Sequence, residues 1–281
     1  MLHKYAVCIP ALLLFAACGS DNSNKEPVIT ADSAEVVIDS AVASLGGKVD
    51  LVISDIPFPF EVLDRLYSTK VPFDQKKMNS LGNVAKYSQY NSKALNLGVY
   101  GADLAYVVTY EQFQQIGSYV KNAKKLAEDL HIPFAFNKEM LDKYSKFKDN
   151  KDSLTQVVYD SYNQVDKTLK GDQRVGIASL VVTGSWLEGL YLSTQTAANA
   201  PEGEQKAELY KTIGAQRQSL TIVIRLLSEY KDDAYIAQLI KDLEEIAPVQ
   251  NNEVKNSNVT NDQLIVTEKV EKLRSRIVEG L

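Results

Sequence analysis

Cysteine is nearly absent from this chain of 281 residues. The two that occur, Cys8 and Cys18, both lie close to the N-terminus, so the remaining body carries no thiol. This absence excludes disulfides, cysteine nucleophiles and cysteine-ligated metals from the body. A secreted body of this size folds without disulfides when its apolar core is large enough.

Histidine is also scarce, because only His3 and His131 occur. We expect His131 to lie at a helix end, where its imidazole contacts the last helical carbonyls. A tetrahedral zinc site needs more ligands than one histidine and no cysteine supply. A Ser-His-acid triad would have to use His131, and neither a nucleophile elbow nor a phosphate-binding glycine loop is present. The sequence therefore predicts no metal ion and no other cofactor.

Glycine and proline are few as well, with 14 and 8 residues, and this favours long regular elements over turns. No Asn-Gly hairpin signal separates alternating runs. Proline spacing and caps predict an all-α bundle of about seven to nine helices. A short strand or extended segment is predicted near residues 48–54. The helices are expected near residues 61–67, 80–90, 92–130, 137–148, 152–170, 173–199, 204–230, 232–246 and 262–279.

Basic residues do not outnumber acidic residues in this chain. Lysine and arginine number 31 against 36 aspartates and glutamates, which gives a formal net charge of −5. The lysines between residues 121 and 151 alternate with acidic residues, as is typical of a solvated surface of mixed charge. A nucleic-acid-binding protein needs a basic face to displace counterions from phosphate. We therefore expect no nucleic-acid partner.

The first residues have the form of an export signal. The apolar run Tyr5–Phe15 is too short to remain as a membrane span. It ends in Ala16-Ala17-Cys18-Gly19, which resembles a bacterial lipobox, with Phe15 where that pattern prefers leucine. The resemblance implies that Cys18 is acylated and anchors the protein to a membrane, since several acyl chains anchor stably. The alternative is an ordinary signal peptide with an incidental cysteine.

These features predict a simple domain organisation. A polar stretch, Gly19–Glu26, follows the cysteine and would hold a body away from the bilayer. No linker-like segment divides the rest of the chain. We expect a signal peptide at residues 1–17, a lipid anchor and polar tether at 18–29, and a single helical domain at 30–281.

Two internal segments, Leu95–Val108 and Ile177–Leu192, are apolar almost all round. Each is shorter than a membrane span and carries an acidic residue and glycines. Because a helix without a polar stripe is surrounded by other helices, both are expected to be buried at the centre of the bundle. Glycine in a helix costs about 1 kcal/mol, and close helix packing is the expected compensation.

Asp103 and Glu188 are the two acidic residues within these segments. A buried carboxylate without a partner costs several kcal/mol or takes up a proton. Arg225 lies in the apolar run Leu220–Leu227, so we expect it to pair with Glu188 or Asp103, together with tyrosine hydroxyls. This is the structural interpretation of the two acids.

Two functional interpretations of the same residues stay open. The first is a ligand cleft, since Trp and Tyr faces beside carboxylates suit sugars or cationic groups. The cleft would be lined by Tyr100, Asp103, Trp186, Glu188, Tyr191 and Arg225. The second is glycoside hydrolysis by the paired acids, which depends on a separation that the sequence does not reveal.

Three segments carry a resemblance to a family: Ile56-Pro57-Phe58-Pro59, Lys93–Leu104 and Gly184–Tyr191. They resemble uncharacterised helical lipoproteins from the envelopes of Bacteroidota. The similarity runs from about Val52 to Leu192 and more loosely beyond. The resemblance implies a membrane-anchored protein of the cell envelope with a helical fold, and it implies no activity. The outer membrane is the expected membrane, and the protein could face the periplasm or the cell surface.

Together these observations predict a lipid-anchored cell-envelope protein that acts as a non-catalytic interaction or scaffolding module. Its expected partners are the membrane, through the anchor, and another envelope protein or a small polar ligand. The alternatives are a solute- or glycan-binding lipoprotein and, more remotely, a hydrolase with two carboxylates.

Overall fold

The computed structural model describes residues 56, 58–132, 136–171, 174–247 and 259–280. The chain divides into two compact units, Met1–Ser40 and Ala41–Leu281, and every described residue belongs to the second. The predicted signal peptide, Cys18 with its tether and the strand near 48–54 lie outside the described residues.

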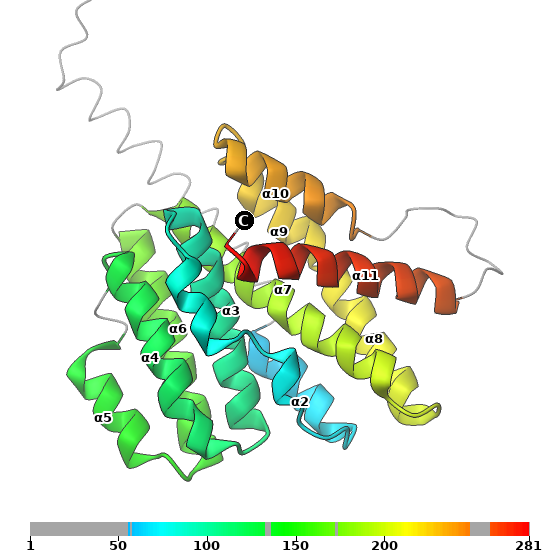
Figure 1. Ribbon diagram of the computed structural model, residues 1–281, viewed down its shortest axis with the longest axis horizontal. Helices are drawn as coiled ribbons and strands as arrows, with labels where there is room; N and C mark the ends of the chain where they lie inside the picture. The colour runs from blue at the N-terminus through cyan, green and yellow to red at the C-terminus, as the bar shows by residue number, and fades with distance from the viewer. Residues whose placement is uncertain (1–55, 57, 133–135, 172–173, 248–258, 281) are drawn as a thin grey trace, which may run out of the picture. The chain divides into compact units, whose positions relative to one another are not determined.

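The described part is all α-helical, as predicted, and contains no strand. It has ten α-helices and three short 3-10 helices, η1 to η3 (Figure 1). The α-helices are α2 (Pro59–Ser68), α3 (Tyr90–Thr109), α4 (Ile116–Asp129), α5 (Lys138–Lys146), α6 (Lys151–Gly171), α7 (Val175–Asn199), α8 (Glu204–Gln218), α9 (Leu220–Ser228), α10 (Ala234–Glu244) and α11 (Val259–Val278). The 3-10 helices are η1 (Gln75–Lys77), η2 (Leu81–Lys86) and η3 (Phe113–Gln115).

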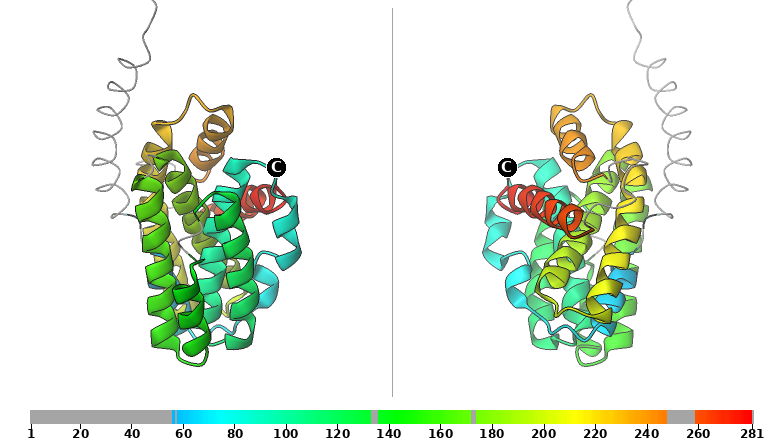
Figure 2. Two further views of the ribbon diagram at one scale, coloured as in Figure 1. Left: turned by 90° about the vertical axis from the view of Figure 1, so that its left-hand side faces the viewer. Right: turned by 90° about the vertical axis from the view of Figure 1, so that its right-hand side faces the viewer.

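Helices α3 and α7 form the centre of this body, which confirms the prediction of two buried helices. They contact each other more extensively than any other pair, and α2, α4, α6, α8, α9 and α11 pack around them (Figures 1 and 2). Among the described helices, α7 alone is long and apolar enough to cross a membrane. Of its most apolar stretch, 78% is buried inside the body, and the core helix of a folded protein meets the same criteria.

Glycines let the two central helices come close together. A methyl group on Gly98 would overlap the carbonyl oxygen of Val181, and one on Gly184 would overlap that of Leu95. Gly101 is similarly close to the ring and hydroxyl of Tyr162 on α6. These contacts confirm that close packing compensates for the low helix propensity of glycine.

The predicted helix 92–130 is wrong as one element, because a turn divides it into α3 and α4. Glu111 adopts the left-handed conformation with φ 57°. Its N–H donates to Val108 O at 3.1 Å and that of Gln112 to Val107 O at 2.8 Å. This is a Schellman motif, which usually uses glycine, so a glutamate in that place gave no stop signal.

The end of α4 repeats the motif at His131, with φ 58°. The backbone N–H of His131 donates to Glu128 O at 3.0 Å. The prediction that its imidazole caps the helix is wrong, since the ring lies 3.1 Å from the hydroxyl of Tyr90 instead. The guanidinium of Arg174 is the side chain that binds the terminal carbonyls of Leu130 and His131.

Two other predicted boundaries need correction. The expected helix 204–230 is divided at Ser219 into α8 and α9, and the expected helix 80–90 is only the 3-10 helix η2. The described residues therefore hold ten α-helices, one more than the largest number expected. Between α2 and α3 the chain runs over the α3–α7 core through residues 74–87, here called the strap.

A buried acid–arginine cluster as the candidate functional site

Three ionisable side chains from distant parts of the chain meet at the centre of the body. Asp103 of α3 and Glu188 of α7 are fully buried, and Arg274 of α11 is 8% exposed. Because Asp103 and Glu188 lie on the two central helices, α11 can reach both by lying across α3 and α7. The structure thus brings the two predicted acids together, but with an arginine other than the predicted one.

Arg274 binds Glu188 through two parallel hydrogen bonds. Its Nε donates to Oε2 at 2.9 Å and its Nη2 to Oε1 at 2.8 Å. Nη2 also donates to the carbonyl oxygen of Lys77 at 3.2 Å, and the guanidinium carbon lies 4.4 Å from the ring centre of Tyr191. Burial is the largest single influence and would lower the pKa of Arg274, but the charge and hydrogen bonds of Glu188, together with other nearby groups, outweigh it and raise that pKa. The guanidinium therefore stays charged.

Asp103 has a different environment. Its Oδ2 accepts a hydrogen bond from the backbone N–H of Asn79 at 2.9 Å, whereas Oδ1 has no hydrogen-bond partner among the described residues. Burial, and then the charge of Glu188, raise the pKa of Asp103 well above its usual range. Its environment therefore favours the protonated form of the Asp103 carboxyl, whereas the Glu188 carboxylate is paired with Arg274.

Tyrosines close the cluster by holding the strap in place. The hydroxyl of Tyr100 donates to Ser80 O at 2.7 Å, and that of Tyr106 accepts from the backbone N–H of Asp74 at 3.2 Å. Tyr87, within the strap, donates to Val278 O of α11 at 3.0 Å. Burial raises the pKa of Tyr87 and of Tyr106 to about 12, so these hydroxyls remain protonated at physiological pH.

The prediction that Arg225 pairs with Glu188 or Asp103 is wrong. It is exposed on α9, because Leu220, Val223 and Leu227 occupy the buried face of that helix. The run around it is apolar in sequence, but a helix turns only one face to the core. Arg274 could have been found from spacing, since it lies four residues after Val270 and four before Val278 within the apolar face of α11.

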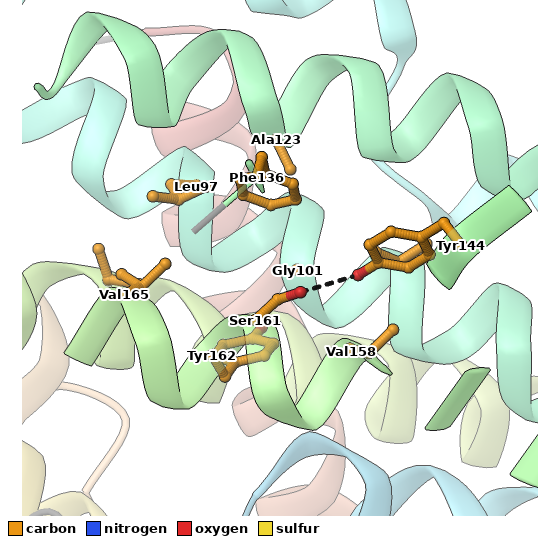
Figure 3. Close-up of a pocket in the computed structure, with 11 residues that line it drawn as sticks. Leu97, Gly101, Ala123, Phe136, Tyr144, Val158, Ser161, Tyr162 and Val165 are labelled. Atoms are coloured by element: carbon orange, nitrogen blue, oxygen red, sulfur yellow. Dashed lines mark hydrogen bonds between the residues drawn. The ribbon is translucent and has the colours of Figure 1, made fainter. Parts of the chain in front are cut away.

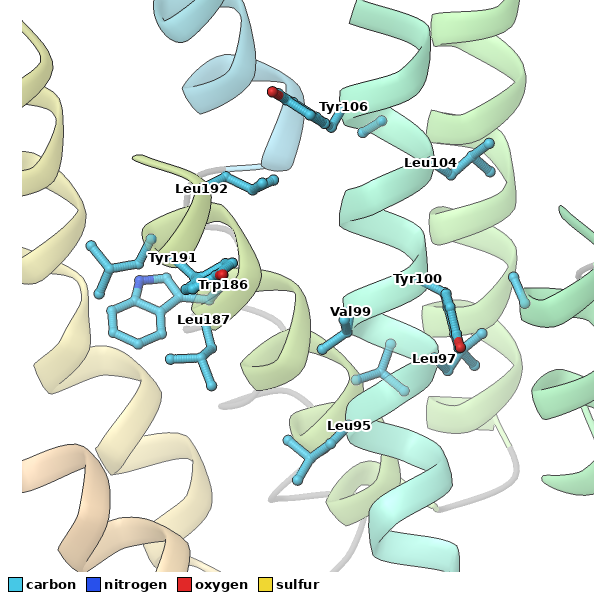
Figure 4. Packing of buried hydrophobic residues seen from close by; sticks show 14 of the residues in the cluster. Leu95, Leu97, Val99, Tyr100, Leu104, Tyr106, Trp186, Leu187, Tyr191 and Leu192 are labelled. Atoms are coloured by element: carbon cyan, nitrogen blue, oxygen red, sulfur yellow. The ribbon is translucent and has the colours of Figure 1, made fainter. Parts of the chain in front are cut away.

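Trp186 does not belong to the cluster either. It lies two residues before Glu188, and this spacing places the two side chains on nearly opposite sides of a helix. Its indole N–H donates to Ser219 Oγ at 2.8 Å, and Figure 4 shows it on the side of α7 away from α3. The predicted cleft is therefore not formed. Of its six residues, Glu188 and Tyr191 contact Arg274, Asp103 accepts from the Asn79 N–H, and Tyr100 fastens the strap.

The geometry limits the chemistry of the two acids. A hydrolase with two carboxylates needs both of them beside the substrate, whereas both oxygens of Glu188 are held by Arg274 and Asp103 is fully buried. Within the described residues no group of three or more His, Cys, Asp or Glu side chains could hold a metal ion.

Two further concave places lie elsewhere in the body. A cavity of about 20 Å³ lies between α3, α4 and α6 near the Tyr144–Ser161 hydrogen bond of 3.2 Å (Figure 3), which is room for a single water. A groove of about 800 Å³ lies on the surface between α4 and α5.

Comparison with protein-family models, with curated proteins and with solved structures gave no match. The function is therefore inferred from the residues of this chain and their geometry.

Proposed function

We propose that this chain is a lipid-anchored cell-envelope protein whose helical body is a non-catalytic interaction module. The anchor part of the proposal depends on the sequence around Cys18. The interaction part depends on one observation, the groove between α4 and α5, because the acid–arginine cluster is filled by the chain's own side chains.

The groove has an apolar floor and a polar rim. Ile116 and Val120 of α4 and Tyr144 of α5 are buried at its floor. Ser145 and Lys148 are exposed at its rim. The groove exists because α5 packs on α6 rather than along α4. A concave apolar strip between two helices is the kind of surface on which proteins bind an amphipathic helix of a partner.

A solute-binding function is the second candidate, and the same groove supports it. Its volume of about 800 Å³ falls in the range of small-molecule sites, roughly 300–1,000 Å³. The ligand would lie on the apolar floor with the Lys148 ammonium beside it, and not at the Trp186 and Glu188 positions where the cleft was predicted.

The anchor is tested by Cys18→Ser in the full chain expressed in a Gram-negative host. We expect the unchanged chain to incorporate labelled palmitate and to partition into the detergent phase, and the variant to do neither. Equal labelling of both chains would contradict acylation at Cys18. The proposed interaction function does not depend on this result and is tested separately at the groove.

The groove is tested by filling it. A side chain at Gly117 meets no atom within 4 Å, so Gly117→Leu adds bulk to the groove without disturbing the core, and Gly117→Ala is the matched control. A photo-crosslinking residue at Ser145 should give one discrete protein adduct in cells, and Gly117→Leu should abolish it. Absence of an adduct at Ser145, or an equal adduct at the distant exposed Lys231, would contradict the interaction module.

The solute alternative is tested by thermal shift with glycans, peptides, nucleotides and polyamines. A ligand at 100 times its Kd adds about 2.7 kcal/mol to stability, which is readily measured. If a compound stabilises the protein and Gly117→Leu abolishes this effect, the solute-binding function is supported in place of the protein-interaction function. No stabilisation by any compound would argue against the solute function.

A further inference from the structure

The groove between α4 and α5 and the interior cavity have one side chain in common. Tyr144 of α5 borders both spaces. Along α4, Val120 borders the groove, and Ala123, about one turn further on, borders the cavity. The two spaces therefore follow each other along α4, with the Tyr144 ring at their boundary.

The cavity beyond this ring is small and apolar. Its wall consists mainly of aliphatic and aromatic side chains of α3, α4 and α6, such as Leu97 and Val158 (Figure 3). The hydroxyls on the wall, those of Tyr144, Ser161 and Tyr162, already have hydrogen-bond partners within the chain. Because a buried water needs two or more polar partners, the space suits the end of an apolar chain better than a water.

The Tyr144 ring can leave the boundary without stranding a buried polar group. Ser161 Oγ donates to the carbonyl oxygen of Val157 at 2.9 Å, so the Tyr144 hydroxyl is the donor in its contact with Ser161. When the ring turns outwards, this hydroxyl donates to water in the groove, and Ser161 keeps its bond to Val157. Helix α5 packs mainly on α6, so the central helices α3 and α7 need not move.

The rim of the groove offers one charge of each sign. Lys148 and Asp149 border the groove and are exposed. Neither side chain forms an ion pair or a hydrogen bond with another described residue. An ammonium and a carboxylate side by side match a zwitterionic head group, whose phosphate binds the lysine while its own ammonium lies beside the aspartate.

We propose that the groove and the cavity together bind a single-chain zwitterionic amphiphile of the alkyl phosphocholine type. The head group lies at Lys148 and Asp149, the alkyl chain lies along the apolar floor, and the chain end enters the cavity past Tyr144. A sugar or an aromatic ring is larger than this cavity of about 20 Å³, whereas the end of a linear chain is not. The proposal rests on the solute-binding candidate above and names the class of solute.

Chain length provides the first test. Alkyl phosphocholines from hexyl to dodecyl are titrated, below their micelle concentrations, into the full chain with Cys18→Ser, which carries no acyl chain of its own. Each buried methylene contributes about 0.8 kcal/mol, so Kd should fall about fourfold per methylene until the chain end fills the cavity, and no further beyond that length. A Kd that does not depend on chain length would overturn the proposal.

Two neighbouring valines of α6 provide a matched pair of variants. Val158 and Val157 are both buried, but only Val158 borders the cavity. Val158→Ile adds one methylene to a space of single-water size and should weaken binding of the longest chain that fits about fourfold. Val157→Ile adds the same methylene elsewhere and should leave the series unchanged. Equal Kd series from the two variants would show that the chain does not enter the cavity.

Tyr144→Phe tests the role of the ring without adding volume. The variant lacks the hydrogen bond to Ser161 that holds the ring in place, and one such bond is worth about 1 kcal/mol. We expect Kd to fall about fivefold for chains long enough to reach the cavity and to stay the same for hexyl phosphocholine. An equal effect on every chain length would contradict the movement of Tyr144.

The head group is tested with decyl glucoside, an uncharged amphiphile with the same chain as decyl phosphocholine. Exposed ion pairs contribute about 0.2–1 kcal/mol each, so the phosphocholine should bind about twofold to tenfold more tightly. The double variant Lys148→Gln/Asp149→Asn should remove this preference. A glucoside that binds the unchanged chain as tightly as the phosphocholine would contradict the zwitterionic ligand.

Gly117→Leu separates this proposal from the function on which it rests, because it should abolish binding of every chain length at the groove. If it does so while Val158→Ile and Val157→Ile behave alike, the groove binds solutes but the cavity takes no part, and the proposal is wrong. If no alkyl phosphocholine binds the unchanged chain, the proposal is also wrong, whereas the crosslink at Ser145 still decides whether the groove binds a protein.

Discussion

Gly98 and Gly184 lie opposite each other where α3 crosses α7, and each brings its own backbone against a carbonyl oxygen of the other helix. The relationship is reciprocal: Gly98 contacts Val181 O, and Gly184 contacts Leu95 O. Any side chain at either position would push the two helices apart. This approach sets the spacing of the core on which the acid–arginine cluster is built.

Gly98→Ala is therefore expected to destabilise the fold by about 3 kcal/mol or more, because overpacking outweighs the gain in helix propensity. Gly214→Ala is the matched control, since Gly214 lies within α8 and a methyl group there meets nothing within 4 Å. That control should gain about 0.5–1 kcal/mol. Urea denaturation of both variants measures the difference, and equal effects would contradict the close approach.

The buried Glu188–Arg274 ion pair should contribute far more to the free energy of unfolding than an ion pair on the surface. Glu188→Gln leaves a buried guanidinium without its counter-charge and should cost about 3–5 kcal/mol of unfolding free energy. Arg276 of the same helix provides a control, because it pairs with Asp242 at 2.7 Å while its side chain is 41% exposed. Asp242→Asn should cost no more than about 1 kcal/mol. A Glu188→Gln protein as stable as Asp242→Asn would show that the buried pair is not structural.

Protonation of Asp103 predicts a specific dependence of stability on pH. Because its pKa is raised in the folded state, the native protein keeps a proton that the unfolded chain releases above about pH 4. The stability from this group is complete below that pH and is lost as the pH rises towards the folded pKa, by about 1.4 kcal/mol per pH unit.

Asp103→Asn removes this titration while it keeps an oxygen for the Asn79 N–H. The variant should gain stability relative to the unchanged chain as the pH rises from about 5 to 7, and the gain should vanish near about pH 4. Chemical denaturation across this range measures it. A stability difference that is the same at every pH would mean that Asp103 is ionised in the folded protein.

The turn after α3 offers a stabilising substitution. Glu111 has φ 57°, a conformation in which glycine is not strained. Glu111→Gly should raise the unfolding free energy by about 0.5–1 kcal/mol, whereas Lys121→Gly, at an exposed position within α4, should lower it by about 1 kcal/mol. Thermal melts of the two variants measure whether each substitution raises or lowers stability. A loss of stability in Glu111→Gly would argue against the left-handed turn.

Helix periodicity accounts for most of what could be predicted about the site. The apolar segments around Asp103 and Glu188 indicated two buried helices, and two buried acids required a cation or a proton. Glu188 has its cation in Arg274, and the raised pKa of Asp103 favours the proton. The identity of the cation was wrong because an apolar run suggested that Arg225 was buried, while only the face of a helix decides which residues reach the core.

Composition and periodicity by themselves determined the all-α class, the two central helices and the need to neutralise the acids, because these follow from local propensity and the cost of burying charge. Only the tertiary structure decided that Arg274 supplies the charge, that Trp186 points away from Glu188, and that the strap closes over both acids. Arg274 and Glu188 are 86 residues apart, and no local preference specifies such a pairing. It arises when α11 places its apolar face on α3 and α7.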